Sequence, residues 1–145
     1  MKPLVLWHAS RADIPRPTLA GRIPGSDTHA NSGLGLFCAT APDDYIAGFG
    51  PYVFEIELVS SARVKRLTIG EFARLSRSAG ETWEDFRDLG QQWAQDYECV
   101  AIEENDGHIL SESAIGRVNR HGREHFLDQL ARPHPGVAPR ARKPG

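Results

Sequence analysis

Three short stretches of the chain hold residue types that can do chemistry. The first is the tripeptide HAS at residues 8–10, and the second is the glycine-rich octapeptide GLGLFCAT at residues 33–40, with Tyr45 a few residues behind it. The third is the acidic tetrapeptide EEND at residues 103–106. An imidazole with donor and acceptor faces, flat aromatic rings and a carboxylate together indicate the binding and activation of a polar ligand.

The expected position of each residue type limits what it can do. His8 is expected at the end of a strand, where its side chain can face a ligand; an ordinary hydrogen-bonded histidine is the alternative. Phe37 and Tyr45 can stack on a flat ring or can be core and surface aromatics. Gly33 and Gly35 allow the backbone to come close to a ligand. They do not make a dinucleotide fingerprint, because GxGxxG is not completed and no βαβ unit follows.

The pentapeptide LWHAS at residues 6–10 and the octapeptide at 33–40 resemble the two N-terminal motifs of the ADP-ribosyltransferase superfamily, most closely its poly(ADP-ribose) polymerase and diphtheria-toxin branch. In that branch the first strand ends in His-Gly-Ser or a near variant, and the second carries a glycine followed by an aromatic and a small residue. The octapeptide VAIEENDG at residues 100–107 is similar to the acidic hairpin of small phage-encoded members, including an anti-CRISPR ADP-ribosyltransferase. The chain departs from the family pattern at Ala9, where the family often has glycine, and at Phe37, where much of it has tyrosine.

The resemblance implies an α+β fold with a split β-sheet core and a helical insertion. It also implies an enzyme that breaks the nicotinamide–ribose bond of NAD, without a metal, and transfers one ADP-ribose unit to a macromolecular acceptor, with a protein expected before a nucleic acid. Such an enzyme would act as a toxin or effector in phage–bacteria conflict. The alternatives are an NAD glycohydrolase, in which water replaces the acceptor, and a catalytically inactive module that binds a ligand or partner. The residues implied for NAD binding are His8, Ala9, Ser10, Gly35, Phe37 and Tyr45.

The acidic residue has a clear chemical task in this reading. Breaking the nicotinamide bond builds positive charge on the ribose, so a carboxylate beside that ring lowers the barrier, while His8 would hold a ribose hydroxyl. Alignment with the phage-type hairpin points to Glu104, which we rank first, whereas closeness to the strand that follows points to Asp106. Glu103 is the third candidate, since strand alternation can turn it elsewhere. Each of them can instead be a solvated turn charge.

The elements that must position these residues follow from periodicity and turn signals. Residues 11–32 are rich in proline and glycine and are expected to form a loop with at most one short helix. The aromatic stripe of the second long helix, which includes Trp83 and Phe86, is expected to be core. Residues 104–107 are expected to be a polar hairpin turn. We expect strands at 4–7, 33–40, 52–59, 63–69, 97–103 and 108–111, a helix that starts at Pro42, and helices at 71–77, 81–96 and 124–131.

Composition limits the class of protein. With 145 residues, of which 40% are hydrophobic and 25% charged, the chain is expected to form a single domain at residues 1–131, followed by a disordered, basic, proline-rich tail at 132–145. The net charge of -2 gives no cationic field that would draw the whole protein onto nucleic acid or an anionic membrane. There is no apolar run of about 18 residues and no signal-peptide core, so a cytoplasmic location is expected.

The cysteines and histidines do not form a recognisable metal pattern. Cys38 and Cys99 each lie in an apolar stretch and are expected to be free, buried thiols. His121 and His125 have the spacing of one helix face, and we expect a solvated polar face there rather than zinc.

Overall fold

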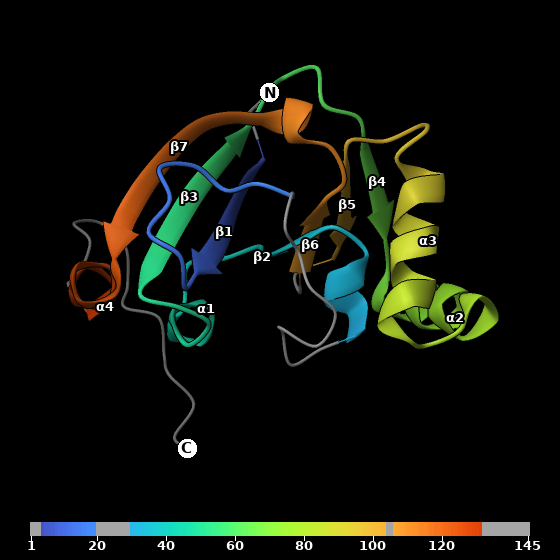
Figure 1. Ribbon diagram of the computed structural model, residues 1–145, viewed down its shortest axis with the longest axis horizontal. Coiled ribbons are helices and arrows are strands. Elements are labelled where there is room, and N and C mark those ends of the chain that lie inside the picture. Colours follow the sequence, from blue (N-terminus) through green and yellow to red (C-terminus); the bar gives the residue numbers. More distant parts are fainter. Residues whose placement is uncertain (1–3, 20–29, 104–105, 132–145) are drawn as a thin grey trace.

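The computed structural model describes residues 4–19, 30–103 and 106–131. They contain a seven-stranded sheet with the strand order β4-β5-β6-β2-β1-β3-β7 (Figure 1). Neighbouring strands are antiparallel except β4 and β5, which are parallel. The strands are β1 (Val5–Ser10), β2 (Leu36–Ala39), β3 (Tyr52–Leu58), β4 (Val64–Leu67), β5 (Cys99–Ile102), β6 (Asp106–Ile109) and β7 (Ile115–Gly122).

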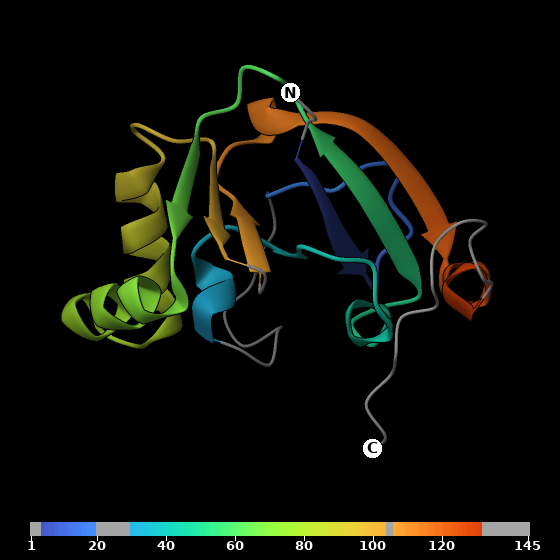
Figure 2. The same cartoon turned by 180° about the vertical axis from the view of Figure 1, so that it is seen from behind.

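The helices form two groups, one beside each half of the sheet. In the two opposite views of Figures 1 and 2, α2 and α3 lie beside β4, while α1 and α4 lie near the ends of β1, β3 and β7. Mixed strand directions with helices segregated in this way confirm the α+β class. The helices are α1 (Asp44–Ala47), α2 (Ile69–Ala79), α3 (Trp83–Trp93) and α4 (Arg123–Ala131), with short 3-10 turns η1 (Ala30–Gly33) and η2 (Glu112–Ala114).

Capping boxes fix where the two long helices begin. The Thr68 side chain accepts a hydrogen bond from the backbone of Glu71, whose carboxylate accepts one from the backbone of Thr68. Thr82 and Asp85 make the same reciprocal pair at the start of α3. Each box satisfies two backbone donors that the first turn of a helix leaves without partners, so local sequence alone sets these boundaries.

The sheet consists of two halves that meet at β1 and β2. β1 pairs with β3 along its full length, whereas its register with β2 is confined to the single pair Trp7↔Ala39. β2 then continues the other half through its ladder with β6. The short junction brings the end of β1 and the start of β6 close to the same strand, β2.

Apolar side chains gather on both faces of the sheet. One cluster, which contains Phe54 and Ile109, fills one face and draws residues from both halves. On the opposite face, a second cluster around Phe126 joins α1 and α4 to the sheet, and a third around Phe86 and Val100 joins α2 and α3 to it. Phe86 of the expected aromatic stripe of α3 is therefore core and Trp93 packs against the same cluster, whereas Trp83 is half-buried and lies outside it. The opposite face holds two separate helix-covered cores, with a boundary between them.

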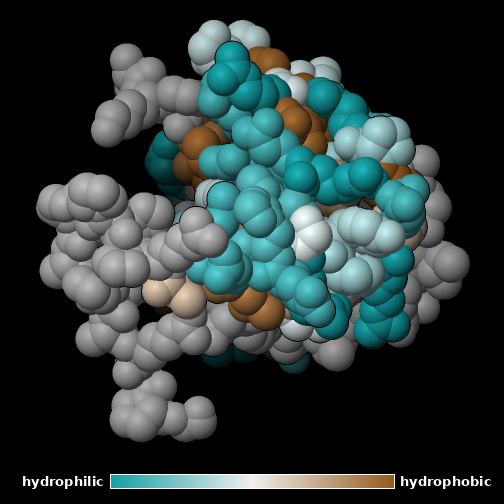
Figure 3. Space-filling model, turned by 90° about the vertical axis from the view of Figure 1, so that its left-hand side faces the viewer, coloured by the Kyte–Doolittle hydropathy of each residue, from teal (hydrophilic) through white to brown (hydrophobic). Residues whose placement is uncertain are grey.

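β7 forms one edge of the sheet and was not expected from the sequence. Arg16 donates from Nη2 to the carbonyl oxygens of Ile115 (2.6 Å) and Gly116 (3.0 Å), and Arg120 bonds to Asp13 and to the carbonyl oxygen of Ile14. The side of the molecule where β7 and α4 lie is mostly hydrophilic (Figure 3). Charged side chains along an edge strand oppose pairing with a second sheet.

Two further expectations need correction, and one is confirmed. Asp106 and Gly107 lie in β6 rather than in a turn, because their backbone pairs with Ala39 and Cys38 of β2. His121 lies in β7, so it does not share a helix with His125 of α4, although the two rings stack at 6.0 Å. The free, buried state of both cysteines is confirmed.

Two further expectations concern membrane-spanning segments and the C-terminal tail. Within the described ranges, no helix is long and apolar enough to cross a membrane. The tail at residues 132–145 lies outside the described residues.

Candidate functional site

A buried acid–histidine pair lies on β6, at the boundary between the two helix-covered cores. Asp106 is 4% exposed and His108 is fully buried. Nε2 of His108 lies 2.5 Å from Oδ2 of Asp106. The other ring nitrogen, Nδ1, is buried and has no hydrogen-bond partner among the described residues. A polar pair of this kind in an apolar setting marks a candidate site.

Aromatic rings surround the imidazole. The ring of Phe37 meets His108 edge-on, with centroids 5.6 Å apart, and the ring of Phe72 stacks on it at 6.4 Å. Phe49, just after α1, contacts Phe37 with centroids 5.7 Å apart. Phe37 belongs to the second cluster and Phe72 to the third, so His108 bridges the two cores. An acid beside partly buried flat rings can hold a planar, cationic ligand group.

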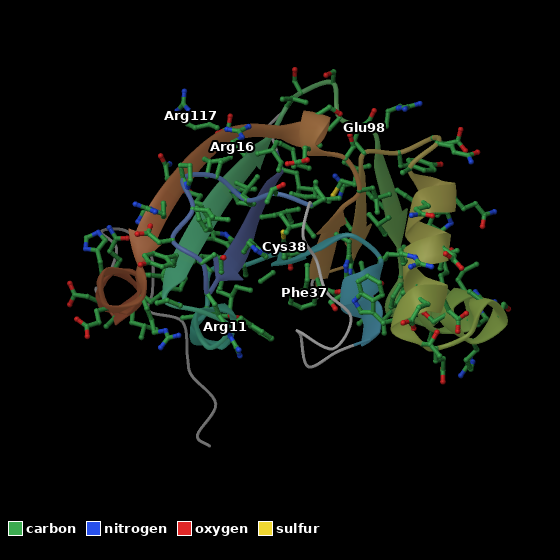
Figure 4. The ribbon with its side chains drawn as sticks, in the orientation of Figure 1. Arg11, Arg16, Phe37, Cys38, Glu98 and Arg117 are labelled. Atoms are coloured by element: carbon green, nitrogen blue, oxygen red, sulfur yellow. The ribbon has the colours of Figure 1, made fainter. Side chains whose placement is uncertain are left out.

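Strand register explains why these side chains meet. Residues two apart on a strand face the same side, which places Asp106 and His108 together on β6. The ladder with β2 sets Phe37 opposite His108 and Ala39 opposite Asp106. Figure 4 shows Phe37 and its neighbour Cys38 on opposite sides of β2, as alternation requires.

His8 reaches the same strand from β1. Its Nδ1 donates to the carbonyl oxygen of Phe37 at 2.7 Å, because a carbonyl can only accept. Nε2 is then the acceptor atom of a neutral His8. The ring itself packs against Phe54, with centroids 6.4 Å apart, on the side of the first cluster. The structure thus links His8 to the backbone of Phe37, while the side chain of Phe37 points toward His108.

Ala9, Ser10 and Gly35, which are also implied for NAD binding, have structural roles of their own. Ala9 is buried in the second cluster. The Ser10 hydroxyl bonds to the backbone of Ala12, which closes the turn after β1. A Cβ on Gly35 would lie 2.5 Å from the carbonyl oxygen of Ile109, so this glycine is needed for the approach of the chain to β6. Tyr45 lies in α1.

The structure separates the three candidate acids. Glu104, ranked first from the sequence, lies outside the described residues. Glu103 is exposed, with a positive φ of 40°, and its carboxylate accepts from the backbone of Ile69 at the start of α2. Asp106 is buried beside His108 and Ala39. Among the described acids of this stretch, Asp106 alone joins the aromatic cluster.

The two cysteine thiols near the site, Cys38 and Cys99, are poorly reactive. Burial raises the pKa of Cys38 well above its ordinary value, and the charges of Cys99 and Asp106 raise it further. Burial also raises the pKa of Cys99, to about 12, against a smaller lowering by Arg66. Both thiols stay protonated at neutral pH, so neither is a nucleophile. Within the described ranges, no group of three or more Cys, His, Asp or Glu residues could hold a metal ion.

Sequence reasoning missed three members of this cluster: His108, Phe49 and Phe72. The pattern Asp-x-His carries a signal for His108, since it puts both side chains on one strand face, but the Asp-Gly pair at residues 106 and 107 also predicts a turn. Phe49 and Phe72 had no local signal, because their contacts depend on how α1 and α2 pack on the sheet.

No family model matches the chain, and no curated protein or solved structure matches it either.

Proposed function

We propose that this chain is an NAD-dependent mono-ADP-ribosyltransferase with Asp106 as its catalytic acid. The observation that carries the proposal is the convergence on β2: His8 bonds to the backbone of Phe37, and the ring of Phe37 contacts His108, the partner of Asp106. These residues come from all three stretches that resemble the transferase motifs. The short β1–β2 ladder agrees with a split sheet.

Asp106 suits the role of a charge-stabilising acid. Loss of nicotinamide leaves an oxocarbenium-like ribose, and a carboxylate held in surroundings of low polarity stabilises that charge more strongly than one in water. Asp106 is 4% exposed, whereas Glu103 is exposed and bonded to the start of α2. We therefore prefer Asp106 to Glu103, while Glu104, ranked first from the sequence, lies outside the described residues.

Phe37 and Phe49 are proposed to hold the nicotinamide ring. They are two of the partly buried rings that pack against the second cluster, with centroids 5.7 Å apart in a tilted arrangement, and rings of this kind can stack on a flat ligand. His8 lies on the other face of the sheet, with its ring against Phe54, so its proposed role is indirect: the hydrogen bond from Nδ1 to the carbonyl oxygen of Phe37 holds the strand that carries the Phe37 ring.

The reaction balances without a redox partner. The bond between ribose C1′ and the nicotinamide nitrogen breaks, and its electron pair leaves with nicotinamide. A nucleophile of the acceptor then forms a bond to C1′ and gives up a proton. A protein side chain is the proposed acceptor, and water in its place would make the same site an NAD glycohydrolase.

Nicotinamide release from NAD tests the proposal. The purified protein would be incubated with NAD that carries a label on its adenosine part, with and without a bacterial lysate, and free nicotinamide would be quantified by chromatography. Asp106→Asn should lower release by about 100- to 1,000-fold, as expected when one electrostatic stabiliser of a transition state is lost. Glu103→Gln is the matched control, because it removes an acid three residues away that lies outside the aromatic cluster.

The outcomes separate the candidate functions. Label transferred to macromolecules supports the transferase, and nicotinamide released without labelled macromolecules supports the glycohydrolase. If neither the protein alone nor the protein with lysate releases nicotinamide, the enzyme proposal fails and the inactive binding module takes its place. If Glu103→Gln abolishes release and Asp106→Asn does not, the assignment of the acid is wrong.

A further inference from the structure

Packing alone does not explain why a histidine occupies position 108. It is fully buried at the centre of a strand, between the rings of Phe37 and Phe72, where an aliphatic side chain would fill the space without polar atoms. Burying a polar ring costs free energy unless its nitrogens are hydrogen-bonded, and Nδ1 has no partner among the described residues. Among the described residues, the ring makes one polar side-chain contact, from Nε2 to Asp106.

Hydrogen-bond accounting assigns the tautomer. A hydrogen on Nδ1 would be a buried donor without an acceptor, and such orphaned N–H groups are rarer in proteins than unused acceptor atoms. A hydrogen on Nε2, by contrast, points at Oδ2 of Asp106 over 2.5 Å, which suits a bond to a charged acceptor. The arrangement therefore favours a neutral imidazole with its hydrogen on Nε2 and a carboxylate on Asp106.

We propose that His108 is a positioning residue, which holds Oδ2 of Asp106 through Nε2–H and so keeps the acid oriented as a carboxylate. The inference rests on the proposed function, because it is Asp106 that would face the substrate. Two features make His108 suited to this role. Its ring is held on one side by β2, through Phe37, and on the other by α2, through Phe72. The imidazole therefore cannot follow Asp106 if that side chain turns.

Three substitutions of His108 separate positioning from packing. Glutamine can place an amide N–H near the position of Nε2, asparagine is one carbon shorter and does not reach it, and leucine fills the volume without a donor. We expect His108→Gln to keep kcat for nicotinamide release within about 5-fold. His108→Asn and His108→Leu should lower kcat by roughly 10- to 100-fold, the rate equivalent of one hydrogen bond to a charged group. KM for NAD should stay within about 2-fold in all three, because His108 does not touch the substrate.

A purely structural role would give a different pattern. It would group His108→Gln with His108→Asn, since both put an amide into the apolar site, and would move the melting temperature without lowering kcat in the variants that remain folded. Circular dichroism at the assay temperature identifies the folded variants, and His108→Gln keeps the comparison open if leucine prevents folding. Equal kcat values for the glutamine and asparagine variants overturn the inference.

Nitrogen NMR of the unmodified protein supplies a test that does not depend on activity. Long-range ¹⁵N–¹H spectra distinguish a protonated ring nitrogen from an unprotonated one. We expect His108 to carry its hydrogen on Nε2 alone, and Asp106→Asn to change the Nε2 shift. A hydrogen on Nδ1 alone overturns the inference even if the enzyme is active. A protein with the expected tautomer and no nicotinamide release overturns the proposed function and, with it, the catalytic role of the pair.

Discussion

Gly90→Ala tests how α3 is anchored to the stretch that leads into β2. Gly90 is buried in the interior of α3, where alanine would ordinarily stabilise a helix by about 1 kcal/mol relative to glycine. The structure reverses that expectation. A Cβ at this position would lie 1.9 Å from the carbonyl oxygen of Leu34 and 2.9 Å from its carbonyl carbon.

The size of the effect follows from that distance. Ordinary contact begins near 3.4 Å, so the helix and the Leu34 backbone must separate by about 1.5 Å (3.4 minus 1.9). Backbone cannot turn away as a flexible side chain can, which puts the cost at the upper end of the range for overpacking, about 3 kcal/mol. Subtracting the gain in helix propensity leaves a net loss of about 2 kcal/mol, or a fall in Tm of roughly 4–8 °C for a chain of this size.

Gly70→Ala is the matched control for this measurement. Gly70 lies in the first turn of α2, is exposed, and would place its Cβ near nothing closer than the Thr68 hydroxyl at 4.0 Å. The same substitution should raise stability there by about 0.5–1 kcal/mol. Both variants would be unfolded by heat and by urea, with circular dichroism and tryptophan fluorescence as independent probes.

The signs of the two changes in unfolding free energy show whether α3 packs as closely against Leu34 as the structure has it. If Gly90→Ala is as stable as Gly70→Ala, α3 does not approach Leu34 as closely as the structure has it, and the packing argument is wrong. A loss for Gly90→Ala with an unchanged urea m-value would place the cost in the folded state, as the argument requires.

Three other expectations follow from separate parts of the molecule. Cys38 and Cys99 should both resist a thiol reagent in the native state and react after unfolding, because burial raises both pKa values, that of Cys99 to about 12; fast native labelling measured by mass would contradict this. Thr82→Ala should cost about 1 kcal/mol in urea unfolding because α3 loses its cap, whereas Thr82→Ser should cost far less. Hydrogen bonds from Arg63 lower the pKa of Glu98, so this carboxylate stabilises the fold above its ordinary pKa, and the contribution is lost as the pH falls through the lowered value. Glu98→Gln should therefore flatten the acid limb of a stability–pH curve measured by Tm, and an unchanged limb would show that the exposed pair contributes nothing.

Several parts of the fold could be predicted from the sequence because local interactions decide them. The capping threonines Thr68 and Thr82 and the apolar spacing behind them mark the starts of α2 and α3, and alternation marks β3. β7 escaped prediction because its sequence, IGRVNRHG, is mostly polar. It is a strand because its backbone pairs with β3 along one edge of the sheet, and no propensity in the segment itself specifies that pairing.

The candidate site likewise has features that the sequence indicates and features that only the tertiary structure sets. The residue types came from the sequence: a histidine after the first strand, Phe37 in the second and a group of acids before a late strand. The placement of Asp106 beside His108 did not, because it depends on the register of β6 against β2, which places Phe37 opposite His108 and Ala39 opposite Asp106. Strand register joins residues that are about 70 positions apart, and a slip of one residue would turn Asp106 to the other face of the sheet. Residue chemistry is thus encoded locally, whereas the partners that each side chain meets depend on long-range pairing of the backbone.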